Sequence, residues 1–193
     1  MNYIKLFVVS LLLTSCATTT ETSIVSSSGL SPFEQSDSER KEYKKALTLL
    51  NNNKLNAAKD VFQQFKENRP ELAGPYANLA IIALKKNEPE KALELVKVAL
   101  TKNPNLAQAL NLLAYLEQVS GEIKKAEKHY KEAIKNKNDY AIAHYNIALL
   151  YDVYLQDIES AIPHYEQYMK LINHEDKSTA DWLEQIKQQK DNG

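Results

Sequence analysis

The side chains best suited to metal or acid–base chemistry are the four histidines, His129, His144, His164 and His174. Three of them stand directly before a tyrosine. No histidine lies three or four residues from another histidine or from a cysteine, the spacing that would place two zinc ligands on one helix face. The sequence also has no His-Glu-x-x-His, Gly-x-Ser-x-Gly, phosphate-loop or Cys-x-x-Cys motif. We therefore predict no metal, no cofactor and no catalytic residues, and we expect that the chain is not an enzyme.

The remaining reactive side chain is the only cysteine, Cys16. Lys5 supplies a positive charge, and an apolar run from Leu6 to Leu13 follows it. This run is too short to span a bilayer as a helix, and the arrangement is typical of an N-terminal export signal. A single cysteine in an exported chain has no disulfide partner within the chain, so its presence needs another explanation.

Leu13-Thr14-Ser15-Cys16 resembles the lipobox of bacterial lipoproteins, an aliphatic residue and two small residues before the cysteine. The resemblance implies a signal peptide over residues 1–15 and lipidation of Cys16 by acyl chains such as palmitate, which together anchor a protein to a membrane. An ordinary secretory signal with an incidental cysteine is the alternative. Ala17 stands where Asp favours retention at the inner membrane in such lipoproteins. The resemblance therefore implies a lipid anchor in the outer membrane, facing the periplasm.

Residues 16–37 are predicted to be the lipidated cysteine and a flexible linker. Ten of the twenty residues from Ala17 to Ser36 are Ser or Thr, and no helical period is present. The alternative is that this tract is itself a recognition segment. As a linker it would let a folded domain sit near the membrane and still move.

Composition favours helix for the rest of the chain. Only four Gly and six Pro occur in 193 residues, while the strong helix formers Ala, Leu, Lys, Glu and Gln are abundant. The net charge of −1 does not suit a polyanion-binding surface, so nucleic acid is not an expected partner.

A repeat of 34 residues organises the chain after Asp37. Ala58, Ala92 and Ala126 recur at this spacing, and the other matching slots are Phe62-Phe65-Pro70, Val96-Ala99-Pro104 and Tyr130-Ala133-Asn138. The pattern resembles the tetratricopeptide repeat, a helix–turn–helix unit of this length. The resemblance implies an all-α solenoid, a right-handed stack of four helix pairs, because each pair buries its apolar surface fully only against its neighbours.

The predicted array covers residues 38–173, with repeats at about 39–72, 73–106, 107–140 and 141–173. Helices are expected at 38–51, 55–68, 73–86, 89–102, 106–119, 122–136, 140–154 and 158–173, with Pro163 shortening or kinking the last. In the first of these helices, charged Glu42 and Lys45 fall in core slots. The fourth repeat has an inter-helix turn one residue longer than the others.

A capping helix is predicted at 178–190. Ser178 to Asp181 reads as a capping box that opens this helix. Trp182 is expected to lie in the core with Leu183 and Ile186, because the last repeat of a solenoid needs a cover.

The resemblance also implies a concave groove lined by the first helix of each pair, where partner segments dock. The slots carried over are Tyr43, Leu47, Ala77, Asn78, Ile81, Asn111, Tyr115, Tyr145, Asn146 and Leu149, together with Leu50, Leu84, Gln118 and Asp152. Apolar side chains with interspersed Tyr and Asn suit an extended or helical segment, with amides bonding its backbone. The alternative is that these residues only pack a compact array.

We therefore expect a periplasmic adaptor that binds other proteins of the cell envelope, with no small-molecule substrate. The chain is similar to the tetratricopeptide-repeat lipoproteins that assist type IV pilus secretins, although those have more repeats. An adaptor for peptidoglycan hydrolases or for a TonB-type energy-transducing system is the second interpretation.

Overall fold

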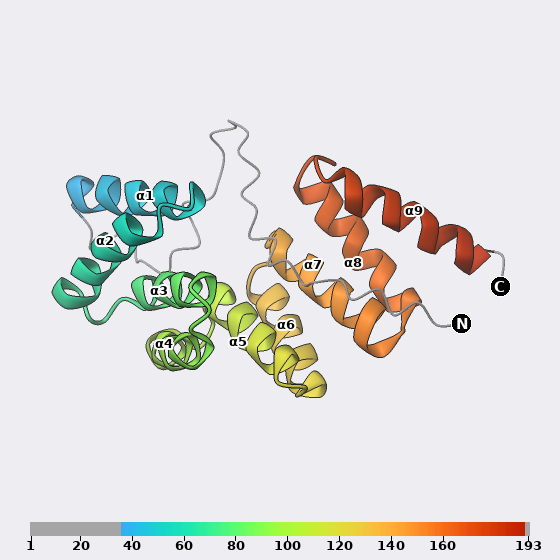
Figure 1. The fold of residues 1–193 in the computed structure, drawn as a ribbon, viewed down its shortest axis with the longest axis horizontal. Coiled ribbons are helices and arrows are strands. Elements are labelled where there is room, and N and C mark those ends of the chain that lie inside the picture. Colours follow the sequence, from blue (N-terminus) through green and yellow to red (C-terminus); the bar gives the residue numbers. More distant parts are fainter. Residues whose placement is uncertain (1–35, 192–193) are drawn as a thin grey trace.

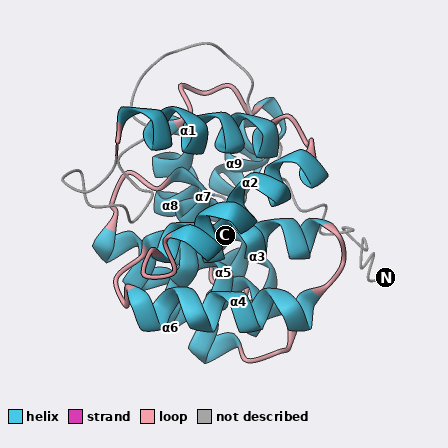
Figure 2. Cartoon of the chain, turned by 90° about the vertical axis from the view of Figure 1, so that its left-hand side faces the viewer, coloured by secondary structure: helices cyan, strands magenta, loops and turns pink. Residues whose placement is uncertain are grey.

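A computed structural model describes residues 36–191, and Cys16 with the predicted signal peptide lies outside this range. Within 36–191 the chain is helical, with short loops and no strand (Figures 1 and 2). The elements are α1 (Asp37–Asn51), α2 (Leu55–Asn68), α3 (Ala73–Lys85), α4 (Pro89–Lys102), α5 (Ala107–Val119), α6 (Ile123–Asn136), α7 (Ala141–Leu149), η2 (Leu150–Leu155, a π-helix), α8 (Ile158–Leu171) and α9 (Lys177–Asp191). No helix in the described part is long and apolar enough to cross a bilayer.

The helices form consecutive pairs. Each second helix packs most closely on the first helix of its own pair, as α4 does on α3, α6 on α5 and α8 on α7. Figure 1 shows the pairs following one another from α1 and α2 at one end to α8 and α9 at the other. This stack is the all-α solenoid that the repeat predicts, and α9 packs on α8 at its C-terminal end.

Small residues at repeating positions let the helices approach. Ala80, Ala114 and Ala148 in the first helices are fully buried. So are Ala58, Ala92, Ala126 and Ala161 in the second helices. Phe62, Val96, Tyr130 and Tyr165, one turn after the second set, fill the space between helices and are also buried. This alternation of small and large side chains is ridges-into-grooves packing.

The first helix of each pair ends in a residue of left-handed conformation. Asn53 has φ of +57°, Asn87 of +59° and Gly121 of +84°, and these three positions are 34 residues apart. The amide that follows closes the turn by bonding a carbonyl five residues earlier, as Lys54 N–H does to Leu49 at 2.8 Å. Asn and Gly are the residues that adopt this conformation most readily at a helix C-terminus.

The fourth repeat accommodates its extra residue in a helix rather than in a turn. α7 continues into the π-helix η2, where each turn contains more residues than an α-turn. The left-handed residue is Gln156, 35 residues after Gly121, and the closing bond from Asp157 N–H reaches Tyr151, six residues back. The expectation of a longer inter-helix turn was therefore wrong, since the turn itself keeps its length.

Three further expectations need correction. Trp182 is 39 % exposed, so it is not a core residue, and Ile186 and Thr179 are the buried residues of α9. α9 is capped by Asp176, which accepts the Thr179 N–H at 3.1 Å, rather than by Ser178. Pro163 lies inside α8 without shortening it.

In α1 the core slots belong to Tyr43, Ala46 and Leu50. Glu42 and Lys45 are exposed, so the conflict between charge and burial seen in the sequence disappears with a small change of register.

Candidate partner-binding groove

The structure divides the ten predicted groove residues into two classes. Leu47, Ile81, Tyr115, Tyr145, Asn146 and Leu149 are partly exposed. Tyr43, Ala77, Asn78 and Asn111 are 0–4 % exposed, so their side chains are not accessible to a partner. Placing these four in the groove was a mistake, because the first helices are packed closely enough to enclose them.

Two of the buried amides join neighbouring repeats instead. Asn78 donates from Nδ2 to the Tyr43 hydroxyl at 2.7 Å and accepts from Gln108 Nε2 at 2.8 Å. Asn146 donates in the same way to Asn111 Oδ1 at 3.1 Å. Asn78 and Asn146 each reach back 35 residues, so the same slot pair is used twice along the array. We interpret these bonds as inter-repeat clasps, since buried polar groups require such partners.

The accessible residues form a row across three first helices. Ile81 on α3, Tyr115 on α5 and Leu149 on α7 are 34 residues apart and partly exposed. Tyr115 and Leu149 pack on one core cluster, that of α6 to α9, and Ile81 packs on the cluster of α3 and α4. We call these three residues the apolar row.

A second set of side chains extends the groove and was missed in the sequence. Val119 is 62 % exposed and Val153 is 60 % exposed, and with Lys85 they occupy one slot at 34-residue spacing. Each lies one helical turn after a member of the apolar row, so both sets share a face of their helices. The signal was present in the sequence, because a valine at this period repeats the spacing of the core residues.

Lys85 is the charged member of this slot. Among residues 36–191 it forms no ion pair or hydrogen bond, and partial burial lowers its pKa. The outer face differs, because its lysines are paired: Lys131 with Glu127 at 2.6 Å, Lys128 with Glu132 at 3.8 Å, and Lys125 with Glu122.

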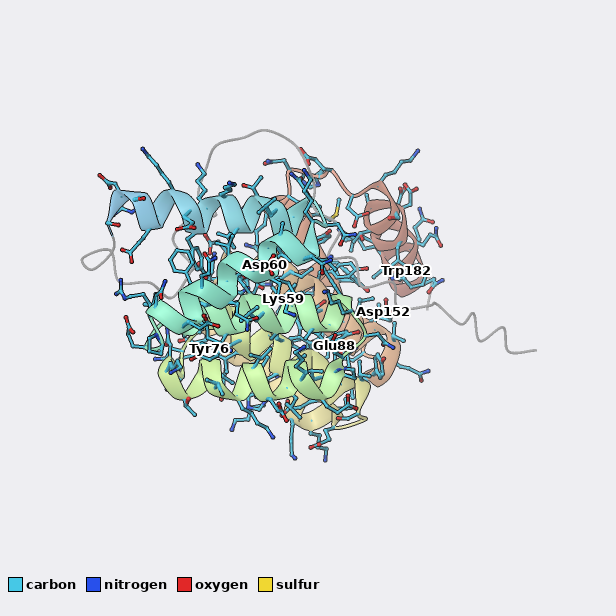
Figure 3. The ribbon with its side chains drawn as sticks, turned by 60° about the vertical axis from the view of Figure 1, so that its left-hand side comes forward. Lys59, Asp60, Tyr76, Glu88, Asp152 and Trp182 are labelled. Atoms are coloured by element: carbon cyan, nitrogen blue, oxygen red, sulfur yellow. The ribbon has the colours of Figure 1, made fainter. Side chains whose placement is uncertain are left out.

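The C-terminal end of the groove carries a carboxylate and an indole. Asp152 Oδ2 accepts from Tyr165 Oη at 3.0 Å and from Trp182 Nε1 at 2.7 Å (Figure 3). The buried residues Thr179 and Ile186 of α9 correspond to Ala143 and Leu150 before it, each 36 residues earlier. Trp182 then corresponds to Asn146, so α9 adds a fifth first helix to the groove.

The structure brings two histidines together that are twenty residues apart. His144 Nδ1 lies 3.1 Å from His164 Nδ1, and His144 Nε2 lies 3.1 Å from the Asn138 carbonyl oxygen. His144 therefore donates from Nε2 and accepts at Nδ1 from the His164 Nδ1–H. Burial lowers the pKa of His164 to about 4, with His144 and Lys131 adding to the shift, so the pair is neutral near pH 7. No group of three potential metal ligands occurs within the described chain.

Between α8 and α9 lies an open recess of about 370 Å³. Met169 and Leu183 contribute apolar walls, and an ion pair between Lys187 Nζ and Glu166 Oε1 at 2.5 Å joins its two sides. It marks the side of α9 on which earlier first helices receive their second helix.

Comparison with known proteins agrees with this architecture. Two family models described as tetratricopeptide repeat match residues 43–107 and 141–174, together about half of the chain. No curated protein sequence matches the chain significantly.

Solved structures share the fold at low identity. A thermophilic tetratricopeptide-repeat protein from Thermus thermophilus is 21 % identical, with a TM-score of 0.62 over 77 % of this chain and 80 % of that one. Pseudomonas aeruginosa pilF is 19 % identical, with a TM-score of 0.66 over 81 % and 70 %. MamA from Desulfovibrio magneticus RS-1 is 19 % identical, with a TM-score of 0.52 over 72 % and 78 %. The repeat period, the stacked helix pairs and the two matching family models together show that this chain belongs to the tetratricopeptide-repeat proteins.

Proposed function

We propose that this chain is a lipid-anchored adaptor of the outer membrane, which faces the periplasm and binds a segment of another envelope protein in its groove. Tetratricopeptide repeats are suited to protein–protein interaction, and the fold here follows that family. The envelope location comes from the lipobox-like sequence at Cys16 and the Ser/Thr-rich tract after it.

The apolar row is the observation that carries the binding proposal. Ile81, Tyr115 and Leu149 remain partly exposed although they lie on successive first helices that enclose their neighbours. A solenoid without a partner has no packing reason to keep large apolar side chains at this position in three successive repeats. A segment lying along the row would cover all three, and interface energy concentrates in such aromatic and aliphatic anchors.

We place the adaptor in the assembly or stability of an envelope machine of the type IV pilus and secretin kind. Support comes from the similarity to pilF, at an identity that reflects the fold, and from the lipoprotein resemblance. Nothing in the groove suits a nucleic acid or a small-molecule substrate, and the proposal includes no catalytic step.

The binding test compares two variants in intact cells by crosslinking, envelope pull-down and mass spectrometry. Tyr115→Ala removes a half-buried ring from the groove and should weaken partner binding by about 1–3 kcal/mol. Helicity by circular dichroism should be unchanged, since Tyr115 lies at the edge of the core. Lys128→Glu, on the outer face of α6, is the control and should keep every partner.

If Tyr115→Ala retains all partners while Lys128→Glu loses them, the groove is not the binding site. Unfolding of Tyr115→Ala would instead assign the ring to the core. The anchor is tested separately with Cys16→Ser, which should no longer fractionate with outer-membrane vesicles. A Cys16→Ser protein that stays in that fraction contradicts lipid anchoring and leaves the groove untouched.

A further inference from the structure

We propose that the C-terminal end of the groove is an anchor site for a basic side chain, arginine or lysine, of the partner segment. Asp152 would bind its charged head, and Trp182 with Leu149 and Val153 would contact its aliphatic stem. The inference rests on the proposed function, because it names the chemistry of the segment that the groove takes up.

The carboxylate of Asp152 is held in place but not neutralised. Its Oδ2 atom accepts two hydrogen bonds, from the Tyr165 hydroxyl and the Trp182 indole, and both donors are uncharged. Its Oδ1 atom has no hydrogen bond within residues 36–191, and the group forms no ion pair there. A partly exposed carboxylate that is fixed on one oxygen and open on the other favours a cationic donor, because charge-assisted hydrogen bonds are the strong ones.

Neighbouring carboxylates that are fixed by hydrogen bonds have either a cation or a helix N-terminus. Glu127 pairs with Lys131 at 2.6 Å. Asp157 and Asp176 accept backbone N–H groups in the first turns of α8 and α9, where the helix dipole favours negative charge. Asp152 has neither kind of partner, so it differs from these groups in lacking a counter-charge from its own chain.

Apolar surface borders this carboxylate. Leu149 and Val153 lie about one turn before it and directly after it on the open side of α7 and η2, and Val153 is 60 % exposed. Trp182 is 39 % exposed although its Nε1 is bonded, so part of its ring is accessible beside Asp152 (Figure 3). Arginine and lysine bury their aliphatic stems on apolar surface and favour aromatic neighbours for their charged heads.

The distribution of charge along the groove assigns the basic residue to this end. Lys85, in the same slot as Val119 and Val153, is the cation at the α3 end and has no ion pair within the described range. It would repel a second cation there. A π-helix carries Asp152, and such wide turns occur frequently at functional sites.

The test uses a phage-displayed library of random dodecapeptides selected on the full-length chain. Enriched peptides should carry Arg or Lys next to aliphatic or aromatic residues. One enriched peptide is then synthesised in two forms, one with arginine and one with citrulline, which has the same shape without the charge. Trp182 is the only tryptophan, so its fluorescence reports occupation of this end directly.

Two variants assign the charge. Asp152→Asn keeps an oxygen that accepts from Tyr165 and Trp182, so it removes the charge and preserves the fold. It should weaken the arginine peptide about 10- to 100-fold and leave the citrulline peptide unchanged, in line with a lost charged hydrogen bond. Asp60→Asn makes the same charge change on the exposed surface of α2 and should leave both affinities unchanged (Figure 3).

The outcomes separate this inference from the proposed function. Peptides that bind and need Tyr115 but show no basic residue, or that bind Asp152→Asn as well as the native chain, overturn the anchor and keep the groove. A library that yields no binding peptide overturns both. A loss of affinity in Asp60→Asn equal to that in Asp152→Asn would reduce the effect to net charge and also reject the anchor.

Discussion

Acid should destabilise the array through the histidine pair between α7 and α8. In the folded chain His164 has a pKa of about 4, against about 6.5 for an unfolded histidine. The unfolded chain therefore binds the proton first, and stability is lost as the pH falls from about 6.5 toward 4. The groups around the ring include His144 on α7, Lys131 on α6 and Tyr151 on η2, which stacks on it at 6.0 Å between centroids.

The geometry gives the reason for this low pKa. A single proton lies between His144 Nδ1 and His164 Nδ1, and protonation of both rings would turn two N–H groups toward each other. Linkage with the full shift gives a loss of about 2 kcal/mol between pH 7 and pH 5. Because His164 is partly exposed, solvent screening reduces our expectation to about 1 kcal/mol.

The assay is urea unfolding followed by circular dichroism at pH 7 and pH 5, on the native chain and on His164→Gln. The variant removes the titrating ring, so its stability should fall less between the two pH values, although it starts lower. His174→Asn is the control, because His174 is exposed and Asn tolerates its φ of +60°. If the native chain and His164→Gln lose the same free energy between pH 7 and pH 5, the histidine pair is not the origin of acid sensitivity.

Two further predictions concern stability. Asn78→Leu should cost about 1–3 kcal/mol in chemical denaturation, because it leaves the buried Tyr43 hydroxyl without its 2.7 Å donor, whereas Asn146→Leu, at a partly exposed clasp, should cost less; equal losses would contradict the role of burial. Gly121→Ala should lower the free energy of unfolding by about 1 kcal/mol, because φ is +84° and a new Cβ would meet no atom within 4 Å, so the cost is in the backbone alone. Gly121→Asn should cost less, since Asn53 and Asn87 fill the same slot, and thermal melts in which Asn is as damaging as Ala would refute this interpretation.

The groove shows what the sequence missed. Tyr43, Asn78 and Asn111 looked like groove residues, because helical period alone gives them the same face as Ile81 and Tyr115. Burial in a solenoid depends on how closely the next pair approaches, and that distance is set by side chains about 34 residues away. Only the tertiary structure could decide that Asn78 bonds Tyr43 and that Tyr115 stays open.

The sequence by itself determined the features that depend on local periodicity. The 34-residue spacing of Ala58, Ala92 and Ala126 and the Asn and Gly residues between helices specify the helix pairs and their order, because small residues and left-handed turns have few alternatives. The tertiary structure decided features in which several geometries satisfy the same local pattern. The extra residue of the fourth repeat could lengthen the turn or widen the helix, and packing of Tyr151 and Tyr165 against neighbouring helices accompanies the wider helix. Trp182 fits a core slot by period, but Ile186 and Thr179 already fill the contact with α8, so the indole lies beside Asp152 at the open end of the groove.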